Sequence, residues 1–411
     1  MNGPRRVPGG PLEVAVIDPS LFTIPYDDAL CDALAAADCR PTLFGRQLRE
    51  SERRAGRAPF EPFFYRFVER RVGAAPVRAL RLAKGIEHAA DMLRLRRLLA
   101  RCVPDVIHFQ WAPLPLIDRH VVPAMRRIAP TVLTVHDTTP FNGSPNERLQ
   151  AIGAAAIYHA FDHLVVLTEG GKAHLVARGI PAETISVIPH GPLEMPPRSI
   201  EAMAAGATEE RIVLAFGKIK PYKGVDLLIE AFAQLPAALK ARARLHFVGE
   251  PFMAMEPLQA RAAALGIADR VCWDLRYVRD EEIGGIIDTA ALLAFPYRQI
   301  DMSGVLMVAL GYGKPIVASA VGAFAELLRD GEHGRLVPPG DVAALRDALA
   351  ELLADPVRAA AMGENVRRIG NMLTSWSDIA EMTLAMYRML IERHRGAAQA
   401  ARQSQPRSAA V

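Results

Sequence analysis

The stretch AFGKIKPYKGVDLLIEAF, residues 215–232, decides the fold because it joins a buried strand to an amphipathic helix through a short loop. The strand RIVLAF (211–216) is apolar without alternation, which is typical of a strand covered on both faces. The apolar residues after the loop recur at helical spacing: Leu227, Leu228, Ala231 and Phe232. The intervening loop, GKIKPYKG (217–224), holds three lysines and two glycines. This order predicts one unit of a parallel α/β sheet.

The same alternation of apolar runs and helical segments occurs in two series along the chain. The strands predicted in the first series are 14–17, 42–44, 106–109, 131–135, 163–167 and 185–188. Those predicted in the second are 211–216, 244–248, 270–273, 291–295, 315–319 and 334–337. The sequence therefore predicts an α/β protein of two doubly wound, Rossmann-like parallel-sheet domains. Ligands are expected at the carboxyl ends of the strands.

The predicted domain boundaries follow from composition. The first domain covers residues 1–191, and a linker rich in Pro and Gly covers 192–210. The second domain covers 211–371, and a helix at 372–395 is expected to pack back on the first domain. The polar segment 396–411 is expected to form a flexible tail.

Composition indicates a packed, enzyme-sized protein in a reducing compartment. The chain has 411 residues, of which 51% are apolar and 23% charged. Its four cysteines show no metal-ligand spacing, and no run of eighteen apolar residues or secretory leader is evident. We therefore expect a cytoplasmic protein.

The loop 217–224 has the features of an anion site. It ends at a predicted helix N-terminus, where free N–H groups and the helix dipole favour negative charge. Lys218 and Lys223 add mobile positive charges that suit a diphosphate. A single lysine in such a loop is more often solvated surface, but three within six residues favour phosphate binding. The loop matches neither a Walker A motif nor a G-x-G-x-x-G fingerprint.

A second loop of this kind is PYRQIDMSGV, residues 296–305. It follows a predicted strand and leads into a helix of small residues, with Ser303 as a reasonable N-cap. The N–H groups of Gly304 and Val305 could face the same anion, although capping alone explains the serine equally well.

These two loops together resemble the family 4 glycosyltransferases of GT-B fold. The resemblance extends to TVHDTTPF (134–141), to residues 165–191 and to VGAFAELLRDGEHGRLVPPGD (321–341). It implies transfer of a hexose from a nucleoside-diphosphate sugar to a saccharide acceptor, with retention of anomeric configuration. It also implies that the second domain holds the donor diphosphate.

The resemblance assigns roles to residues at matching positions. Lys218 and Lys223 would bind the pyrophosphate and neutralise the leaving group, and His136 would line the donor sugar or its phosphate. The remaining expected donor-site residues are Gly217, Ser303, Gly304, Val305, Glu250 and Glu326. A turn role explains Glu250 equally well, and Glu326 is expected at a helix start, where a carboxylate is favourable in any case.

The chain departs from the family pattern at two glutamates. The corresponding positions hold Ile300 and Val308, whose side chains cannot accept a hydrogen bond. Asp301 could replace the first carboxylate with a shift of one residue, and solvent exposure is the alternative. The departure leaves open a non-catalytic nucleotide-sugar-binding partner. Another GT-B activity, such as an epimerase or a phosphorylase, also stays open.

No metal or cofactor is expected besides the donor. The sequence has no D-x-D and no H-E-x-x-H motif. The lysines would then supply the charge that a magnesium ion supplies elsewhere.

Basic character is concentrated between Arg46 and Arg101, with 15 Lys and Arg against 6 Asp and Glu. This segment, 46–102, is compatible with peripheral contact with an anionic membrane, and equally with core-packed helices that carry a solvated arginine face. No nucleic-acid module accompanies the charge. A membrane-facing first domain would suit a lipid-linked saccharide acceptor in cell-surface polysaccharide synthesis. Tyr26 and Asp27, after the first strand, are the candidate acceptor residues.

Overall fold

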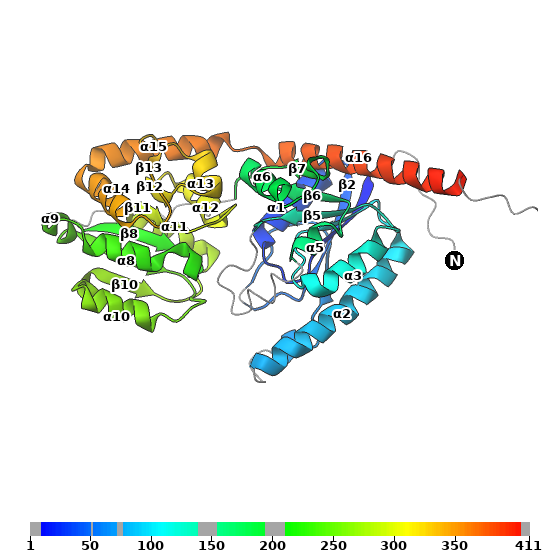
Figure 1. The fold of residues 1–411 in the computed structure, drawn as a ribbon, viewed down its shortest axis with the longest axis horizontal. Helices are drawn as coiled ribbons and strands as arrows, with labels where there is room; N and C mark the ends of the chain where they lie inside the picture. The colour runs from blue at the N-terminus through cyan, green and yellow to red at the C-terminus, as the bar shows by residue number, and fades with distance from the viewer. Residues whose placement is uncertain (1–9, 51, 72–76, 139–153, 194–209, 404–411) are drawn as a thin grey trace, which may run out of the picture. The chain divides into compact units, whose positions relative to one another are not determined.

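The computed structural model describes residues 10–50, 52–71, 77–138, 154–193 and 210–403, which divide into two units (Figure 1). The first unit contains the described residues up to 138, residues 154–189 and residues 374–403. The second unit contains residues 190–193 and 210–373. Most of the predicted linker, 194–209, lies outside the described residues.

The first unit is built on a seven-stranded parallel sheet of order β3-β2-β1-β4-β5-β6-β7. Its strands are β1 (Leu12–Asp18), β2 (Cys39–Arg46), β3 (Phe60–Phe64), β4 (Val106–Phe109), β5 (Thr131–Val135), β6 (His163–Val166) and β7 (Ile185–Val187). All six strands predicted for this half are present. The edge strand β3 was not predicted, and it lies inside the basic segment. The strand order reverses between β1 and β4, which places a ligand crevice at their carboxyl ends.

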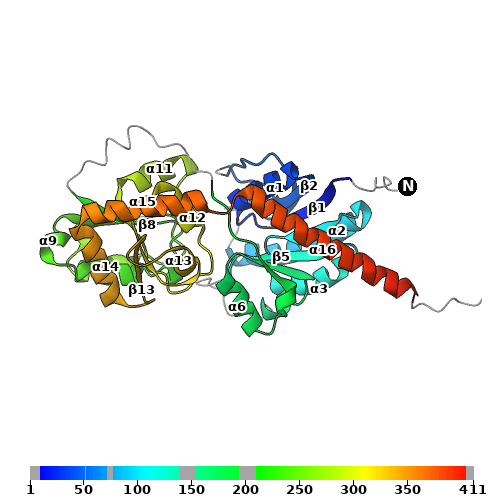
Figure 2. The same ribbon diagram turned by 90° about the horizontal axis from the view of Figure 1, so that it is seen from above.

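Helices cover both faces of this sheet. They are α1 (Ile24–Ala36), α2 (Val77–Cys102), α3 (Pro115–Met125), α5 (Ala154–Tyr158), α6 (Glu169–Ala177) and α16 (Trp376–Gln403). The last helix, α16, packs along α1 (Figure 2), and the Tyr387 hydroxyl meets Nδ1 of His108 at 2.5 Å. It continues to Gln403, past residue 395, where the sequence predicts a tail to begin. Alanine, glutamine and arginine dominate that extension and are strong helix formers.

The second unit is a six-stranded parallel sheet of order β10-β9-β8-β11-β12-β13. Its strands are β8 (Arg211–Phe216), β9 (Ala243–Val248), β10 (Val271–Asp274), β11 (Ala290–Phe295), β12 (Ile316–Ser319) and β13 (Gly334–Val337). Its helices are α8 (Val225–Ala233), α9 (Ala237–Lys240), α10 (Glu256–Ala264), α11 (Asp280–Thr289), α12 (Gly304–Tyr312), α13 (Gly322–Leu327), α14 (Val342–Ala354) and α15 (Pro356–Met372). The order reverses between β8 and β11. Two parallel sheets flanked by helices confirm the predicted fold class.

Within the described residues, no helix is both long and apolar enough to span a membrane.

Candidate functional site

Two loops meet at the carboxyl ends of β8 and β11, which are hydrogen-bonded neighbours in the second sheet. The first loop, 217–224, includes a short 3-10 turn (Pro221–Lys223) and leads into α8. Its last residue, Gly224, has φ +68°, and a Cβ there would lie 2.1 Å from the Pro296 carbonyl oxygen. Only glycine allows this approach of the two backbones. The two predicted loops are therefore in direct contact.

An ion pair locks the loops together. The Arg298 guanidinium donates to both carboxylate oxygens of Asp226, at 3.0 and 2.6 Å, and to the Pro221 carbonyl at 3.0 Å. The Arg298 backbone N–H donates to the Tyr222 carbonyl at 2.8 Å. Such a bidentate pair restrains orientation as well as distance. The arginine of PYR thus positions the loops and is already engaged.

Lys223 is the most unusual charged group of this region. Its side chain is half-buried, and removal of the amine from water lowers the pKa of Lys223 to about 7. Within the described part of the chain, its Nζ has no carboxylate or hydrogen-bond acceptor as a partner. The Tyr297 ring lies nearby, with its centroid 5.3 Å from Nζ. A cationic group withdrawn from water without a counter-ion is suited to an anionic ligand.

Gly217 and the start of α12 adjoin the Lys223 amine. Gly217 has φ +99°, and a Cβ there would lie 3.1 Å from Lys223 Nζ and 2.7 Å from a Val305 methyl carbon. The absence of a side chain therefore leaves space between the β8 loop and α12. Ser303 is the N-cap of α12, and its Oγ accepts from the Leu306 N–H at 3.3 Å. Gly304 is exposed in the first turn of the helix.

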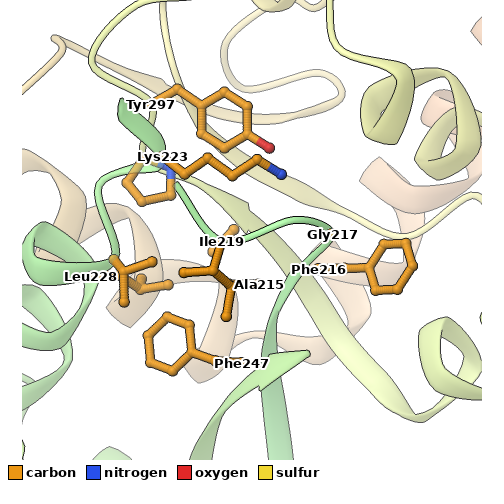
Figure 3. Close-up of a pocket in the computed structure, with 11 residues that line it drawn as sticks. Ala215, Phe216, Gly217, Ile219, Lys223, Leu228, Phe247 and Tyr297 are labelled. Carbon is orange, nitrogen blue, oxygen red and sulfur yellow. The ribbon is translucent and has the colours of Figure 1, made fainter. Parts of the chain in front are cut away.

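A hollow beneath this loop connects the lysine to the core of the unit (Figure 3). It is lined by Ala215, Phe216, Gly217, Ile219, Lys223, Val225, Leu228, Phe247, Ala294, Pro296 and Tyr297. Most of these side chains are apolar, and the exceptions are the amine of Lys223 and the hydroxyl of Tyr297. Tyr297 was not among the predicted site residues, although the sequence places it directly after a strand.

The other predicted donor-site residues of this unit are more exposed. Lys218 is exposed, with its Nζ 5.9 Å from the Phe252 ring centroid, and Glu250 is exposed after β9. Asp301 is half-buried in the β11–α12 loop, where its carbonyl accepts from the Ala323 N–H at 2.7 Å. Glu326 is exposed in the second half of α13 and not at the helix start that the sequence predicts. Whether these side chains contact donor stays a prediction.

The two positions that lack glutamates have apolar packing. Ile300 and Val308 are both half-buried against the apolar cluster that includes Phe295, Leu306 and Phe324. Their side chains therefore contribute to the packing of the unit.

His136 lies in the first unit, directly after β5, and is part of an aromatic cluster. Its ring stacks on Trp111 at 5.1 Å between centroids, and it makes a T-shaped contact with the Tyr26 ring at 4.9 Å. Its Nε2 pairs with the Gln110 side-chain oxygen at 3.2 Å. These contacts fix the imidazole at the carboxyl ends of neighbouring strands. A role toward the donor stays a prediction.

The candidate acceptor residues are buried, which argues against direct contact of their polar groups with an acceptor. Tyr26 is 3% exposed and Asp27 is fully buried. Burial, followed by the charge of Asp18, raises the pKa of Asp27 well above its usual value. Asp18 accepts from the N–H groups of Phe22 and Thr23, at 2.6 and 3.3 Å, so this acidic pair holds the loop after β1. The exposed side chain of that loop is Phe22, which the sequence reasoning missed.

Family comparisons agree with this geometry. A profile described as "Glycosyltransferase Family 4" matches residues 28–191, and one described as "Glycosyl transferases group 1" matches residues 210–355. The D-inositol 3-phosphate glycosyltransferase of Kribbella flavida is 30% identical over 313 residues, 70% of this chain and 72% of that protein. The MMP alpha-(1->4)-mannosyltransferase of Mycolicibacterium hassiacum is 33% identical over 189 residues. That match covers 46% of this chain and 45% of the relative, less than two thirds of its length.

A solved structure supports the fold independently. The Anabaena protein in complex with UDP-glucose aligns with a TM-score of 0.70 at 18% identity, covering 92% of this chain and 100% of that protein. The two sheets and their strand-end loops define the GT-B class of sugar-transferring folds. The chain belongs to the family 4-like GT-B glycosyltransferases.

Proposed function

We propose that the protein transfers a hexose from a nucleoside-diphosphate sugar to a saccharide acceptor that is linked to a lipid, with retention of anomeric configuration. The product would enter a cell-surface polysaccharide or glycoconjugate, and the enzyme would work in the cytoplasm at the inner face of the plasma membrane. The Kribbella and Mycolicibacterium relatives are named as glycosyl- and mannosyltransferases, and the Anabaena structure contains UDP-glucose. These names support a hexose nucleotide as donor.

The observation that carries the proposal is the half-buried Lys223 amine. It lies beside Gly217 and the N-terminal turn of α12, and no carboxylate pairs with it among the described residues. A diphosphate would supply the missing negative charge and accept hydrogen bonds from the helix N–H groups. Lys218, on the exposed side of the same loop, would contact the second phosphate.

The proposed mechanism uses the chain's own charges and no metal ion. As the bond between the anomeric carbon and the phosphate oxygen breaks, negative charge develops on the departing diphosphate. Lys223, Lys218 and the α12 N-terminus would stabilise that charge. The acceptor hydroxyl would attack the anomeric carbon from the face that the diphosphate leaves, and its proton would pass to an oxygen of the departing diphosphate. His136 and Asp301 are the proposed contacts with the transferred sugar.

Donor nucleotides are expected to stabilise the protein against heat. A ligand at 100 times its Kd adds about 2.7 kcal/mol to the free energy of unfolding, a shift of roughly 5–11 °C for domains of this size. A thermal-shift panel of nucleoside diphosphates and their sugar conjugates should identify one preferred base. Incubation of that donor with membrane glycolipid extract should then yield a sugar-bearing product. A panel without any response would contradict the proposed function.

A non-catalytic nucleotide-sugar-binding partner is the second candidate. The apolar packing of Ile300 and Val308, at positions where the family usually has glutamates, favours it. Such a protein would give the same thermal shifts, yet no acceptor extract would yield product. An epimerase or phosphorylase would instead convert or release sugar without an acceptor glycan.

We also propose that α2 brings the enzyme to an anionic membrane. Leu82 and Ile86, 70% and 66% exposed, lie on one side of this helix. Phe67 is 53% exposed, and its N–H donates at 2.6 Å to the side chain of Glu87, the residue after Ile86. Arg97 is exposed further along the same side. Apolar side chains flanked by basic ones are typical of membrane-surface helices.

The double substitution Leu82→Asp, Ile86→Asp is expected to reduce co-sedimentation with phosphatidylglycerol vesicles at least about fivefold, because it removes apolar insertion and adds repulsion from the anionic surface. Val357→Asp is the matched control, since Val357 is an exposed apolar residue of the second unit. Equal sedimentation of wild type and the double variant would reject the α2 surface as the membrane contact.

A further inference from the structure

Tyr297, the second residue after β11, has a hydroxyl group that the mechanism above does not use. We infer that this hydroxyl is a hydrogen-bond donor to the diphosphate of the donor substrate, paired with the Lys223 ammonium. The inference deepens the proposed function and rests on it. It assigns a phosphate contact to a neutral side chain of this chain's own loop.

The Tyr297 ring is held rigidly. It makes edge-on contacts with Tyr222, Phe295 and Phe324, at centroid distances of 5.7, 5.8 and 5.3 Å. The next residue is tied to α8 by the Arg298–Asp226 ion pair. The ring therefore cannot swing toward solvent without breaking the contact between the two loops.

The hydroxyl of Tyr297 is buried without a hydrogen-bond partner in the described part of the chain. The residue is 2% exposed, and no N–H, carbonyl or carboxylate is placed to pair with its oxygen. The neighbouring Ser303 Oγ accepts from the Leu306 N–H, and its position relative to the Tyr297 oxygen does not meet the geometry of a hydrogen bond. A buried polar group normally has a hydrogen-bond partner, so a buried hydroxyl without one indicates that a bound molecule supplies the partner.

Tyr297 and Lys223 share this missing partner. In Figure 3 the two side chains run side by side and their polar ends point in the same direction, toward Gly217. The Lys223 Nζ lies 5.3 Å from the ring centroid. Gly217 has no side chain, so the space next to Nζ stays open. A Cβ at this position would lie 3.1 Å from Nζ. One ligand at this point can therefore contact both donors.

The chemistry of the surroundings favours a phosphate. The tyrosine hydroxyl, the ammonium and the first-turn N–H groups of α12 are all donors, so the ligand must supply several acceptor oxygens and negative charge. A water molecule could satisfy the hydroxyl but would leave the ammonium without a counter-ion. A sugar hydroxyl would supply acceptor atoms but no charge.

Tyr297→Phe removes the hydroxyl and keeps the ring. Calorimetric titration with UDP, GDP, ADP, CDP and dTDP should show a five- to tenfold weaker Kd for the preferred diphosphate, while the corresponding nucleoside, which lacks phosphates, binds wild type and variant equally. The melting temperature without ligand should be unchanged or higher, since an unsatisfied buried group has been removed.

Tyr312→Phe is the matched control, because that hydroxyl is also buried in the second unit but faces Gly284 of α11. It should bind the diphosphate as wild type does. Wild-type affinity in Tyr297→Phe would overturn the inference while leaving the proposed function intact. A loss confined to the sugar conjugates, with diphosphate affinity unchanged, would assign the hydroxyl to the sugar instead and also overturn it. Failure of wild type to bind any diphosphate would reject the proposed function and this inference together.

Discussion

Lys223→Met is expected to weaken nucleoside-diphosphate binding at least about 100-fold, since a charge-assisted hydrogen bond to phosphate contributes up to about 3 kcal/mol. The same substitution should stabilise the free protein. Burial lowers the pKa of Lys223 from 10.5 to about 7, so the folded state holds this amine at a cost. Methionine fills similar space without a charge. Chemical denaturation at pH 7 should show a free energy of unfolding about 2 kcal/mol higher than that of wild type.

Two comparisons isolate the position of the charge. Arg261→Met also removes one positive charge from the second unit, at an exposed ion pair between Arg261 of α10 and Glu230 of α8, and should leave the affinity within about twofold. Lys218→Met should weaken binding less than Lys223→Met, because Lys218 is exposed. A Lys223→Met protein that binds the diphosphate as tightly as Arg261→Met would remove Lys223 from the site.

The affinity of wild type for the diphosphate should fall as pH rises through neutrality. With the pKa of Lys223 at about 7, the free site is half-neutral at pH 7 and must take up a proton to pair with phosphate. The phosphates are fully ionised above about pH 7, so Kd should rise roughly fifteenfold between pH 7 and pH 8.5. Titration calorimetry in buffers of different ionisation enthalpy would also detect the proton uptake.

The stability of the free protein should change with pH in the opposite direction. Between about pH 7 and 10.5 the unfolded chain binds more protons at this lysine than the folded one, so the free energy of unfolding rises with pH across that window. Lys218→Met should keep the pH profile of binding, since Lys218 is exposed. A Kd that stays constant from pH 6.5 to 9 would show that the Lys223 amine is already charged in the free protein.

Most of the fold could be predicted because buried parallel strands appear in the sequence as apolar runs. The exception, β3, runs from Phe60 to Phe64 and includes Pro62. It lies at the sheet edge, where one side of the strand has no neighbouring strand to hydrogen-bond with and proline is tolerated. Its surroundings are rich in arginine, so neither periodicity nor composition marked it as a strand. The segment is recognised as a strand only in the structure, where it pairs in parallel with β2.

The candidate site was predictable where backbone position alone places a residue. Gly217, Lys223 and Val305 come together because they follow adjacent strands of one sheet. The burial of individual side chains could not be predicted from backbone position. Asp27 follows a strand too, but pairs with Asp18 inside the first unit. Tyr297 becomes a candidate only once its ring packing and unpartnered hydroxyl are known.

The helix α16 gives this chain an unusual order of assembly. Its residues are synthesised after those of the second unit, yet it packs on α1 and reaches His108 in the core of the first unit. During translation the second unit can close as soon as α15 leaves the ribosome, whereas the first unit waits until α16 has emerged. Domains usually fold from the N-terminus onward as they emerge. A nascent chain halted after residue 373 should therefore expose the α1 surface and recruit chaperones, although its second unit is already folded.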